Sequence, residues 1–446
     1  MRILLVNPPR SPENAIYESA PKEAKHFVHK KLIGPPLGLL TIAEAVKDHE
    51  VTLLEMKGEY DLVPNALAPE ALLLKYLNKV NPDIVGVTFI ASEFPAGLAL
   101  LRTVKQYDPH ILTVAGGLHA ILCPEDFEDP AVDVLYCNQS AHAFRDLVQA
   151  HGSGQSFEQI GGLQIRTGKT LSPTKAAVPE RDIAGTDFIP PDRSLLKRWL
   201  STYRVGQASG LSTYLYTSLG CQFRCSFCSI WPQFKGVYYQ RHIDSVVEEL
   251  KTLDDYEVVR FADANTVIDS KFAKQLFDKI EAEGINKTYV MDIRADTAAN
   301  SPHLIEKMAR AGLKVVITGF ESFREEELRN YNKKLKVDLI NEAMHVFHEN
   351  DIMVRGNYVV PPDYAENDFA ALSEFAAGHK VALAGYTILT PMPGTNFHRE
   401  VQAQIVDRDL AKYNFFNCVM KTKLPLEKFY EYVGELWKIR LGSQVI

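Results

Sequence analysis

The chain has 446 residues and a net charge of −7, and these two properties already exclude several classes of protein. A chain of this length can form two or three domains with separate cores. The negative charge and the lack of a basic arm disfavour binding to a nucleic-acid backbone, so we expect no nucleic acid among the partners. Hydrophobic residues at 46% and charged residues at 24% are ordinary values for a globular protein.

Six cysteines occur, three of them in one short run, which favours a reducing compartment over a disulfide scaffold. The apolar part of the first nine residues is too short for a signal peptide. The most apolar stretch, residues 110–124, is interrupted by two glycines and is too short to span a bilayer. We therefore expect a cytoplasmic protein with no transmembrane segment.

The first 150 residues alternate short apolar runs with helical patterns. The runs predict five buried strands, over Ile3–Val6, Val51–Leu54, Ile84–Phe89, Leu112–Ala115 and Val132–Tyr136. Helical spacing of apolar residues lies between them, over Gly38–Lys47, Pro69–Asn78 and Ala96–Tyr107. This alternation predicts an α/β, doubly wound domain over residues 1–151, with ligands at the carboxyl ends of its strands.

Residues 152–205 lack long periodic runs and are rich in proline, so we expect a linker with a short hairpin over Leu163–Leu171. Beyond it, six strands are predicted, over Tyr214–Ser218, Val258–Ala262, Thr288–Ile293, Val315–Gly319, Val354–Val360 and Gly385–Thr390. With their helices they predict a partial (βα)6 TIM-like barrel over residues 206–400, whose reactive groups gather at the carboxyl ends of the strands. Residues 401–446 are expected to form a helical C-terminal cap.

Three cysteines with the spacing CxxxCxxC, Cys221, Cys225 and Cys228, follow the first strand of the expected barrel. A four-iron cluster normally takes four thiolates, so three leave one iron open, and an open position marks a reactive metal site. Zinc with a histidine is the alternative, but the next histidine, His242, lies outside the usual finger spacing. We therefore expect a 4Fe-4S cluster on these three cysteines.

The cysteine spacing, with Phe227 before the last cysteine, resembles the radical S-adenosylmethionine superfamily, and the whole chain resembles its cobalamin-binding (class B) branch. In the first half the matching segments are Asn7-Pro8-Pro9, Pro35-Pro36-Leu37-Gly38-Leu39-Leu40 and Gly116-Gly117-Leu118-His119. The resemblance implies a cobalamin-binding domain followed by a radical barrel. It also implies three cofactors, a 4Fe-4S cluster, S-adenosylmethionine and cobalamin.

The resemblance further implies binding residues for both organic cofactors. For S-adenosylmethionine they are Phe227, Asp263, Asn265, Arg294, Glu321, Ser322, Tyr386 and Pro391. For cobalamin they are Pro8, Leu37, Gly38, Thr88, Gly116, Gly117 and His119. Purely structural roles are the alternatives, with Asp263 capping a helix and Arg294 paired with Asp292 or Asp296. The Lys30-Lys31 and Lys333-Lys334 pairs are predicted to be solvated, and Cys418 to be a packing residue.

Two departures from the family pattern concern cobalamin. The Asp-x-His-x-x-Gly motif that supplies a histidine to cobalt is absent, because Asp108-Pro109-His110 lacks the glycine and precedes a strand. The usual Gly-Glu-Gly-Glu turn after the fifth strand is replaced by Cys137-Asn138-Gln139-Ser140. We therefore expect bound cobalamin to have no histidine ligand, and a domain that keeps the fold without the cofactor is the alternative.

The activity implied is that of a cobalamin-dependent C-methyltransferase, which acts on an unactivated carbon through a 5′-deoxyadenosyl radical and methylcobalamin. A radical cyclase, rearrangement or oxidation enzyme of the same fold is the alternative. Expected partners are a small-molecule, lipid or peptide substrate and an electron donor such as flavodoxin or ferredoxin. A tRNA methylthiotransferase is disfavoured, because that group carries three cysteines in its N-terminal domain and only Cys123 and Cys137 are available here.

Overall fold

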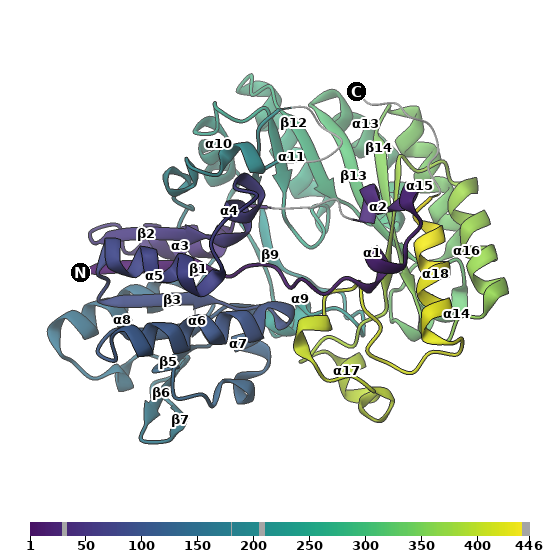
Figure 1. Cartoon of the computed structure of the whole chain (residues 1–446). Coiled ribbons are helices and arrows are strands. Elements are labelled where there is room, and N and C mark those ends of the chain that lie inside the picture. Colours follow the sequence, from purple (N-terminus) through teal and green to yellow (C-terminus); the bar gives the residue numbers. More distant parts are fainter. Residues whose placement is uncertain (29–33, 180, 205–209, 439–446) are drawn as a thin grey trace. The chain divides into compact units, whose positions relative to one another are not determined.

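The computed structural model describes residues 1–28, 34–179, 181–204 and 210–438, and the chain forms two compact units (Figure 1). Unit 1 contains Met1–Pro12 and Pro35–Tyr203, and unit 2 contains Glu13–Gly34 and Arg204–Ile446. The chain therefore begins in one unit, enters the other and returns. In the described part of the chain, every helix is too short or too polar to span a bilayer.

Unit 1 is built on one seven-stranded sheet in the order β2-β1-β3-β4-β5-β6-β7. Its strands are β1 (Arg2–Asn7), β2 (Glu50–Glu55), β3 (Ile84–Thr88), β4 (Leu112–Gly116), β5 (Val134–Tyr136), β6 (Leu163–Thr167) and β7 (Thr170–Pro173). The first five pair in parallel, as their continuous apolar runs predict. The strand order reverses between β1 and β3, and sheets of this kind bind ligands at the carboxyl ends beside such a reversal.

The helices of unit 1 connect these strands and cover the sheet. They are α3 (Leu37–Ala45), α4 (Met56–Leu62), α5 (Pro69–Val80), α6 (Phe94–Tyr107), α7 (Leu118–Leu122) and α8 (Ala141–Ser153). Helix α3 packs against α8, and α5 packs against α6. The predicted doubly wound fold is confirmed, although α4 and α8 lay outside the helices predicted from periodicity.

Residues 152–203, most of the expected linker, belong to unit 1. Strand β6 pairs antiparallel with β5, and β7 completes the predicted hairpin. Near its end, Arg198 makes two 2.7 Å hydrogen bonds to Glu59, and Trp199 Nε1 donates to the same carboxylate at 2.9 Å. Arg198 also holds the pKa of Glu59 below its usual range. The expected boundary at residues 205–206 lies outside the described residues.

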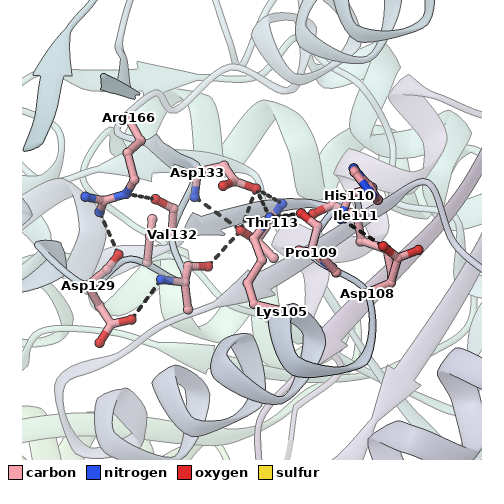
Figure 2. Close-up of polar contacts among 11 residues, drawn as sticks. Lys105, Asp108, Pro109, His110, Ile111, Thr113, Asp129, Val132, Asp133 and Arg166 are labelled. Atoms are coloured by element: carbon pink, nitrogen blue, oxygen red, sulfur yellow. Dashed lines mark hydrogen bonds and ion pairs between the residues drawn. The ribbon is translucent and has the colours of Figure 1, made fainter. Parts of the chain in front are cut away.

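A polar network fixes the edge of this sheet at which β4 and β5 begin (Figure 2). Lys105 Nζ bonds to Asp133 at 2.5 Å and to the carbonyl oxygen of Ile111 at 2.7 Å. Thr113 Oγ1 donates to the Ala131 carbonyl at 2.7 Å, and Arg166 Nε donates to the Val132 carbonyl at 2.6 Å. Because these groups bond mainly to backbone next to the strand starts, they fix the register of β4, β5 and β6.

Unit 2 contains a six-stranded parallel sheet in the order β15-β14-β13-β12-β11-β8. The strands are β8 (Ser212–Leu215), β11 (Val258–Phe261), β12 (Thr288–Asp292), β13 (Leu313–Glu321), β14 (Met353–Val360) and β15 (Leu383–Ile388). The main helices are α10 (Ile243–Lys251), α11 (Ser270–Ala282), α13 (Pro302–Arg310), α15 (Val337–Glu349) and α16 (Glu366–Gly378). Within the described strands, β8 and β15 do not pair with each other, so the barrel is open, as predicted.

The end of the chain adds α17 (Asn396–Glu400) and α18 (Leu426–Leu436). Helix α18 packs against α16 and against α1 (Ala15–Ser19), which comes from the start of the chain (Figure 1). The side-chain amides of Asn414 and Asn417 both donate to the Glu13 carbonyl, at 2.6 and 3.1 Å. Residues 13–28 therefore pack with unit 2, a correction to the continuous N-terminal domain expected over residues 1–151.

Candidate functional site

The cysteine loop follows β8 and the short strand β9 (Ser218–Gly220), which pairs with β10 (Tyr238–Gln240). Gly220 has φ +82°, and a Cβ there would lie 2.1 Å from the Val237 carbonyl oxygen, so only glycine fits before the first cysteine. Cys225 is buried, and Cys221 and Cys228 are half-buried. The loop thus leaves the carboxyl end of the first barrel strand, where the sequence pattern placed it.

Two distant segments hold the cysteine loop. The amide of Ser226 donates to the Tyr331 carbonyl at 2.9 Å, and Asn332 Nδ2 donates to the Arg224 carbonyl at 2.8 Å. From the other side, the amide of Phe397 donates to the Ser226 carbonyl at 2.9 Å. Phe227 packs against an apolar cluster that contains Tyr331, Val359 and Leu389. The residues after β13 and β15 therefore fix the shape of the loop.

The three thiols suit a cluster better than a single metal ion. Among the described residues, the one trio of possible ligands whose atoms converge within 4.8 Å is His119, Cys123 and Asp126, so the three sulfur atoms of the loop are more widely spaced. A cube binds its thiolates on different irons and accepts such spacing. Burial raises the pKa of Cys228 to about 11, so a metal must displace its proton. His242 is exposed and does not complete a zinc site.

Asp263 supports the strand that leads to the cysteines. Its carboxylate accepts hydrogen bonds from the Thr217 amide at 2.8 Å, the Thr217 hydroxyl at 2.7 Å and the Ser218 amide at 2.8 Å. Burial raises the pKa of Asp263 to about 6 in spite of these donors. These bonds make Asp263 a positioning residue, while the cap of α11 is Asp269, whose side chain accepts from two backbone amides.

Asn265 differs from Asp263, because it is 2% exposed and its side-chain nitrogen and oxygen have no hydrogen-bond partner among the described residues. A buried amide without partners is costly, by about 1–3 kcal/mol per group. An amide both donates and accepts, so it matches the amino, carboxylate or hydroxyl groups of a bound small molecule. The structure therefore offers an unsatisfied polar group just after β11, where S-adenosylmethionine was predicted to bind.

Arg294 joins two loops around the cysteines. Its guanidinium bonds to both oxygens of Asp296, at 2.9 and 2.7 Å, and to the Lys333 carbonyl at 2.9 Å. It also lies 3.9 Å from the centre of the Phe223 ring, in the cysteine loop. Of the two partners considered from sequence, Asp296 is the one it takes. The contact with Phe223 places Arg294 directly against the cysteine loop.

Glu321 and Lys333 form a buried ion pair beside the cysteines. Lys333 Nζ lies 2.7 Å from Glu321 Oε1, and each side chain is 10% exposed. A Cβ on Gly319 would lie 2.1 Å from that same oxygen, so glycine is needed for the carboxylate to fold back. Burial lowers the pKa of Lys333, but Glu321 and Cys225 outweigh it and raise the pKa above the ordinary value. A cation is therefore held near Cys225.

Lys333 is a correction to the sequence analysis, which expected both lysines of the pair to be solvated. Lys334 is exposed, whereas Lys333 is 8% exposed. No periodicity marks Lys333, because its position depends on the left-handed backbone at Asn332 and Lys334, with φ of 51° and 53°. The other pair, Lys30-Lys31, lies outside the described residues.

Three further predicted residues have structural partners. Ser322 Oγ donates to Glu327 at 2.5 Å and accepts from the Arg324 amide at 2.9 Å, so it fixes the start of α14 (Glu325–Asn330). Tyr386 faces the helices, with its ring 6.0 Å from that of Trp437, and this orientation argues against contact with a ligand inside the barrel. Pro391 is buried in the turn after β15.

The carboxyl edge of the sheet in unit 1 offers open surface beside the reversal of strand order. Gly38 is exposed in the first turn of α3, and a Cβ there would have no neighbour within 4 Å. Ile90, two residues beyond β3, is 40% exposed. Pro8 and Leu37 are buried behind this edge. Backbone amides at a helix start beside an exposed apolar side chain suit a large ring with polar rim groups, such as a corrin.

The end of β4 is occupied by internal packing. Gly116 lies opposite Thr88 in the sheet, and Gly117 lies against the backbone of Phe89. His119 is 2% exposed and lies 2.8 Å from Asp126, at an angle unsuited to a hydrogen bond. Its ring packs 5.1 Å from Phe94 and 5.7 Å from Phe127. The imidazole is therefore buried beside Phe94 and Phe127, and its contact with cobalamin stays a prediction.

Hydrogen bonds fix the altered turn after β5. Asn138 Nδ2 donates to the Gly161 carbonyl at 2.9 Å, and Asn138 Oδ1 accepts from the Ser140 amide at 2.8 Å. The amide of Cys137 donates to the Gly162 carbonyl at 2.9 Å. The turn is thus held by the segment before β6. Asp108-Pro109-His110 lies before β4, at the opposite edge of the sheet (Figure 2), and cannot supply a ligand at the carboxyl edge.

Comparison with known proteins assigns both units. The radical SAM superfamily model matches residues 215–376, and the B12 binding domain model matches residues 28–148. The chain is 27% identical to the uncharacterized methyltransferase PH0819 of Pyrococcus horikoshii, over 95% of this chain and 88% of the relative. It is 29% identical to the anaerobic magnesium-protoporphyrin IX monomethyl ester cyclase of Cereibacter sphaeroides, over 79% of this chain and 58% of the relative.

A solved structure has the same fold along almost the whole chain. The radical S-adenosylmethionine methyltransferase TsrM from Kitasatospora setae, with cobalamin and a [4Fe-4S] cluster bound, aligns with a TM-score of 0.68 at 17% identity. The alignment covers 96% of this chain and 84% of TsrM. Given these matches and the open barrel with its three-cysteine loop, the chain belongs to the cobalamin-binding (class B) radical S-adenosylmethionine family.

Proposed function

We propose that the chain is a cobalamin-dependent C-methyltransferase that acts on an unactivated carbon. The observation that carries this proposal is the presence, in one chain, of the three-cysteine barrel loop and of a doubly wound unit with an open carboxyl edge. The cysteine loop is typical of a radical enzyme, and the doubly wound unit is typical of a corrin-binding domain. When bound, the cluster with S-adenosylmethionine supplies a 5′-deoxyadenosyl radical, and methylcobalamin supplies the methyl group.

Different residues around the cysteine loop bind the cluster and S-adenosylmethionine. Cys221, Cys225 and Cys228 bind the cluster. Asn265 supplies the free amide, and the Glu321–Lys333 pair supplies a carboxylate and an ammonium, for the polar end of S-adenosylmethionine. Arg294 and Asp263 act as positioning residues, because they join the cysteine loop to its neighbours without a free polar group of their own. Phe227 and its apolar cluster exclude water from one side of the loop.

In unit 1 the proposed corrin surface is the edge around Pro8, Leu37, Gly38 and Thr88. The exposed Ile90 and the open space at Gly38 receive the ring. Gly116 and Gly117 shape the end of β4 behind this surface. His119 is buried and His110 lies at the other edge of the sheet, so we expect no histidine ligand to the cobalt.

A radical cyclase or oxidation enzyme is the second candidate, because the Cereibacter sphaeroides relative is named as a cyclase. The same cluster and the same corrin domain serve both, so the distinguishing step is the transfer of a methyl group. For either activity a protein electron donor such as flavodoxin or ferredoxin is required, since the cluster must be reduced before each cleavage. None of the six cysteines, all of which lie in the described residues, forms a disulfide, which suits a reducing compartment such as the cytoplasm.

The cluster assignment predicts that the three loop cysteines are not equivalent to the other cysteines. After anaerobic reconstitution, the chain should bind four irons, and alanine at Cys221, Cys225 or Cys228 should abolish the cluster because each thiolate binds a different iron. Cys418, buried and distant in sequence, provides the matched control, and Cys418→Ala should keep its iron. Iron and sulfide analysis with optical spectra measures this, and a triple variant that still holds four irons would contradict the assignment.

The Glu321–Lys333 pair predicts an electrostatic effect on the cluster. Lys333→Met removes a buried positive charge near Cys225, so it should shift the cluster's midpoint potential to a more negative value and weaken binding of S-adenosylmethionine. Lys334→Met, one residue away but exposed, should change neither. Lys333→Arg should restore most of the potential, because it keeps the charge. Spectroscopic redox titration measures these shifts, and equal potentials for Lys333→Met and Lys334→Met would show that Lys333 does not act on the cluster.

The corrin surface predicts that bulk at Gly38 blocks cobalamin without disturbing the fold. Gly38→Leu should fold normally, because a Cβ has no neighbour there, yet it should retain at least about tenfold less hydroxocobalamin, since the side chain fills the ring's space. Gly378→Leu is the control, because Gly378 is also an exposed helical glycine without neighbours. Retained cobalamin, reduced to Co(II), should show no nitrogen coupling in paramagnetic spectra. If Gly38→Leu and Gly378→Leu retained equal amounts of cobalamin, the corrin would not bind at Gly38.

Methyl transfer distinguishes the two candidate activities. With reductant, S-adenosylmethionine and cobalamin, the wild-type protein should form S-adenosylhomocysteine and methylcobalamin even without substrate, because methylation of the corrin precedes transfer to carbon. A cyclase or oxidation enzyme should form 5′-deoxyadenosine and no S-adenosylhomocysteine. Chromatography of the nucleoside products separates these results. Absence of S-adenosylhomocysteine in cobalamin-loaded protein would favour the second candidate.

A further inference from the structure

On strand β14 the side chains that face the barrel interior are more accessible than those that face the helices. On β14 the side chains of Met353, Arg355 and Asn357 are half-buried, whereas Val354, Gly356 and Tyr358 between them are buried. Tyr358 packs its ring edge-on to that of Phe375 in α16, 6.3 Å away, so the buried set faces the helices. In a filled barrel the inward set would be the buried one. On β14 the inward set is therefore the more accessible one, whereas Val258, Val290 and Val315 on the neighbouring strands pack together with Met353.

One layer of this interior is charged. Arg260 on β11 donates to Asp292 on β12, at 2.7 Å from Nη2, and to the Tyr214 hydroxyl on β8 at 3.2 Å. Ile317 on β13 is in register with both Asp292 and Arg355, so Arg355 belongs to the same layer. Two guanidinium groups thus share one carboxylate, and the layer carries one excess positive charge.

Arg355 has no hydrogen bond or ion pair with any described residue, and its Nε atom is buried without a partner. Burial and the neighbouring Arg260 lower its pKa to about 10. A guanidinium in such a place destabilises the free protein, because part of its hydration is lost and the one nearby carboxylate, Asp292, is already bonded to Arg260. Groups held in this way are found where a ligand supplies the missing interaction.

We propose that this layer binds an anionic group of the substrate, a carboxylate or a phosphate-like oxyanion, with Arg355 donating directly to it. The inference rests on the proposed function, since it names the substrate class of the same barrel. Arg260, already paired with Asp292, adds positive charge and holds the layer in place. An oxyanion would meet the planar fork of Arg355 with two parallel hydrogen bonds.

The strand register also gives the depth of the charged layer in the barrel. Arg355 lies three residues before Tyr358, which is in register with Glu321. At about 3.3 Å per residue, the charged layer lies about 10 Å below the Glu321–Lys333 level. This depth separates the layer from the polar end of S-adenosylmethionine, which Asn265, Glu321 and Lys333 are placed to bind.

Chemical modification tests whether an anion reaches Arg355. In cluster-loaded protein without turnover, phenylglyoxal should modify Arg355, and inorganic phosphate or succinate should slow this at least about tenfold by occupying the layer. If only phosphate protects Arg355, the anionic group of the substrate is phosphate-like. If only succinate protects it, the group is a carboxylate. Arg310, whose side chain is 61% exposed, is the internal control and should react equally in all samples. Peptide mass spectrometry measures each site.

Two results would overturn the inference. Equal modification of Arg355 with and without both anions excludes an anion site, and protection by S-adenosylmethionine alone assigns the charge to the cofactor instead. Neither depends on methyl transfer. S-adenosylhomocysteine formation is measured separately on wild-type protein. Its absence would refute the proposed methyl transfer without refuting the anion site, and its presence would not by itself establish the anion site.

A pair of variants tests the same inference through stability. Arg355→Met removes an uncompensated charge, so its melting temperature should equal or exceed that of the wild type, while the rise of roughly 3–6 °C that saturating phosphate gives the wild type should vanish. Arg260→Met leaves Asp292 without its partner and should lower the melting temperature. A melting temperature of Arg355→Met well below that of the wild type would mean that Arg355 is a structural residue and would refute the site.

Discussion

The buried ion pair between Glu321 and Lys333 is the interaction on which the geometry of the radical site depends. Breaking a pair of this kind costs about 3–5 kcal/mol, because the remaining charge has no water. The pair holds the residues after α14 beside β13, and the Tyr331 carbonyl and the Asn332 side chain then bond to the cysteine loop. Arg294 also joins these residues to the cysteine loop, because it bonds to the Lys333 carbonyl and contacts the Phe223 ring. A charged pair therefore shapes a loop whose own residues are mostly thiols and apolar groups.

Buried polar groups in the barrel are of two kinds, those with hydrogen-bond partners in the chain and those without. Asp263 and Ser322 have all their hydrogen bonds supplied within the chain, and they fix the segments that carry the cofactor-binding residues. Asn265 and Arg355 have none from the described residues, and such groups lower the stability of the free protein. The number of hydrogen bonds within the chain therefore distinguishes structural residues from binding residues better than residue type does. Asp263 and Asn265 are two positions apart and chemically similar, yet the first is fully bonded and the second is not.

In unit 1 the same distinction explains how a turn without the family's glycines is tolerated. Asn138 replaces backbone flexibility with side-chain hydrogen bonds to the segment before β6, so the turn keeps a fixed shape. The open part of the carboxyl edge lies elsewhere, at Gly38 in the helix after β1 and at Ile90 after β3, beside the reversal of strand order. The altered turn is therefore a change in the support of the edge and leaves the proposed corrin surface unobstructed.

The sequence by itself determined the order of strands and helices, the cysteine loop and the class of chemistry, because periodicity and cysteine spacing are local properties that need no knowledge of packing. The tertiary structure decided what depends on residues distant in the chain. It moved residues 13–28 to unit 2, joined residues 152–203 to the first sheet, buried His119, and buried Lys333 while Lys334 stayed exposed. It also brought Arg260, Asp292 and Arg355 into one layer. None of these follows from a local pattern, since each is set by the register of separate strands and by which partner a buried charge can reach.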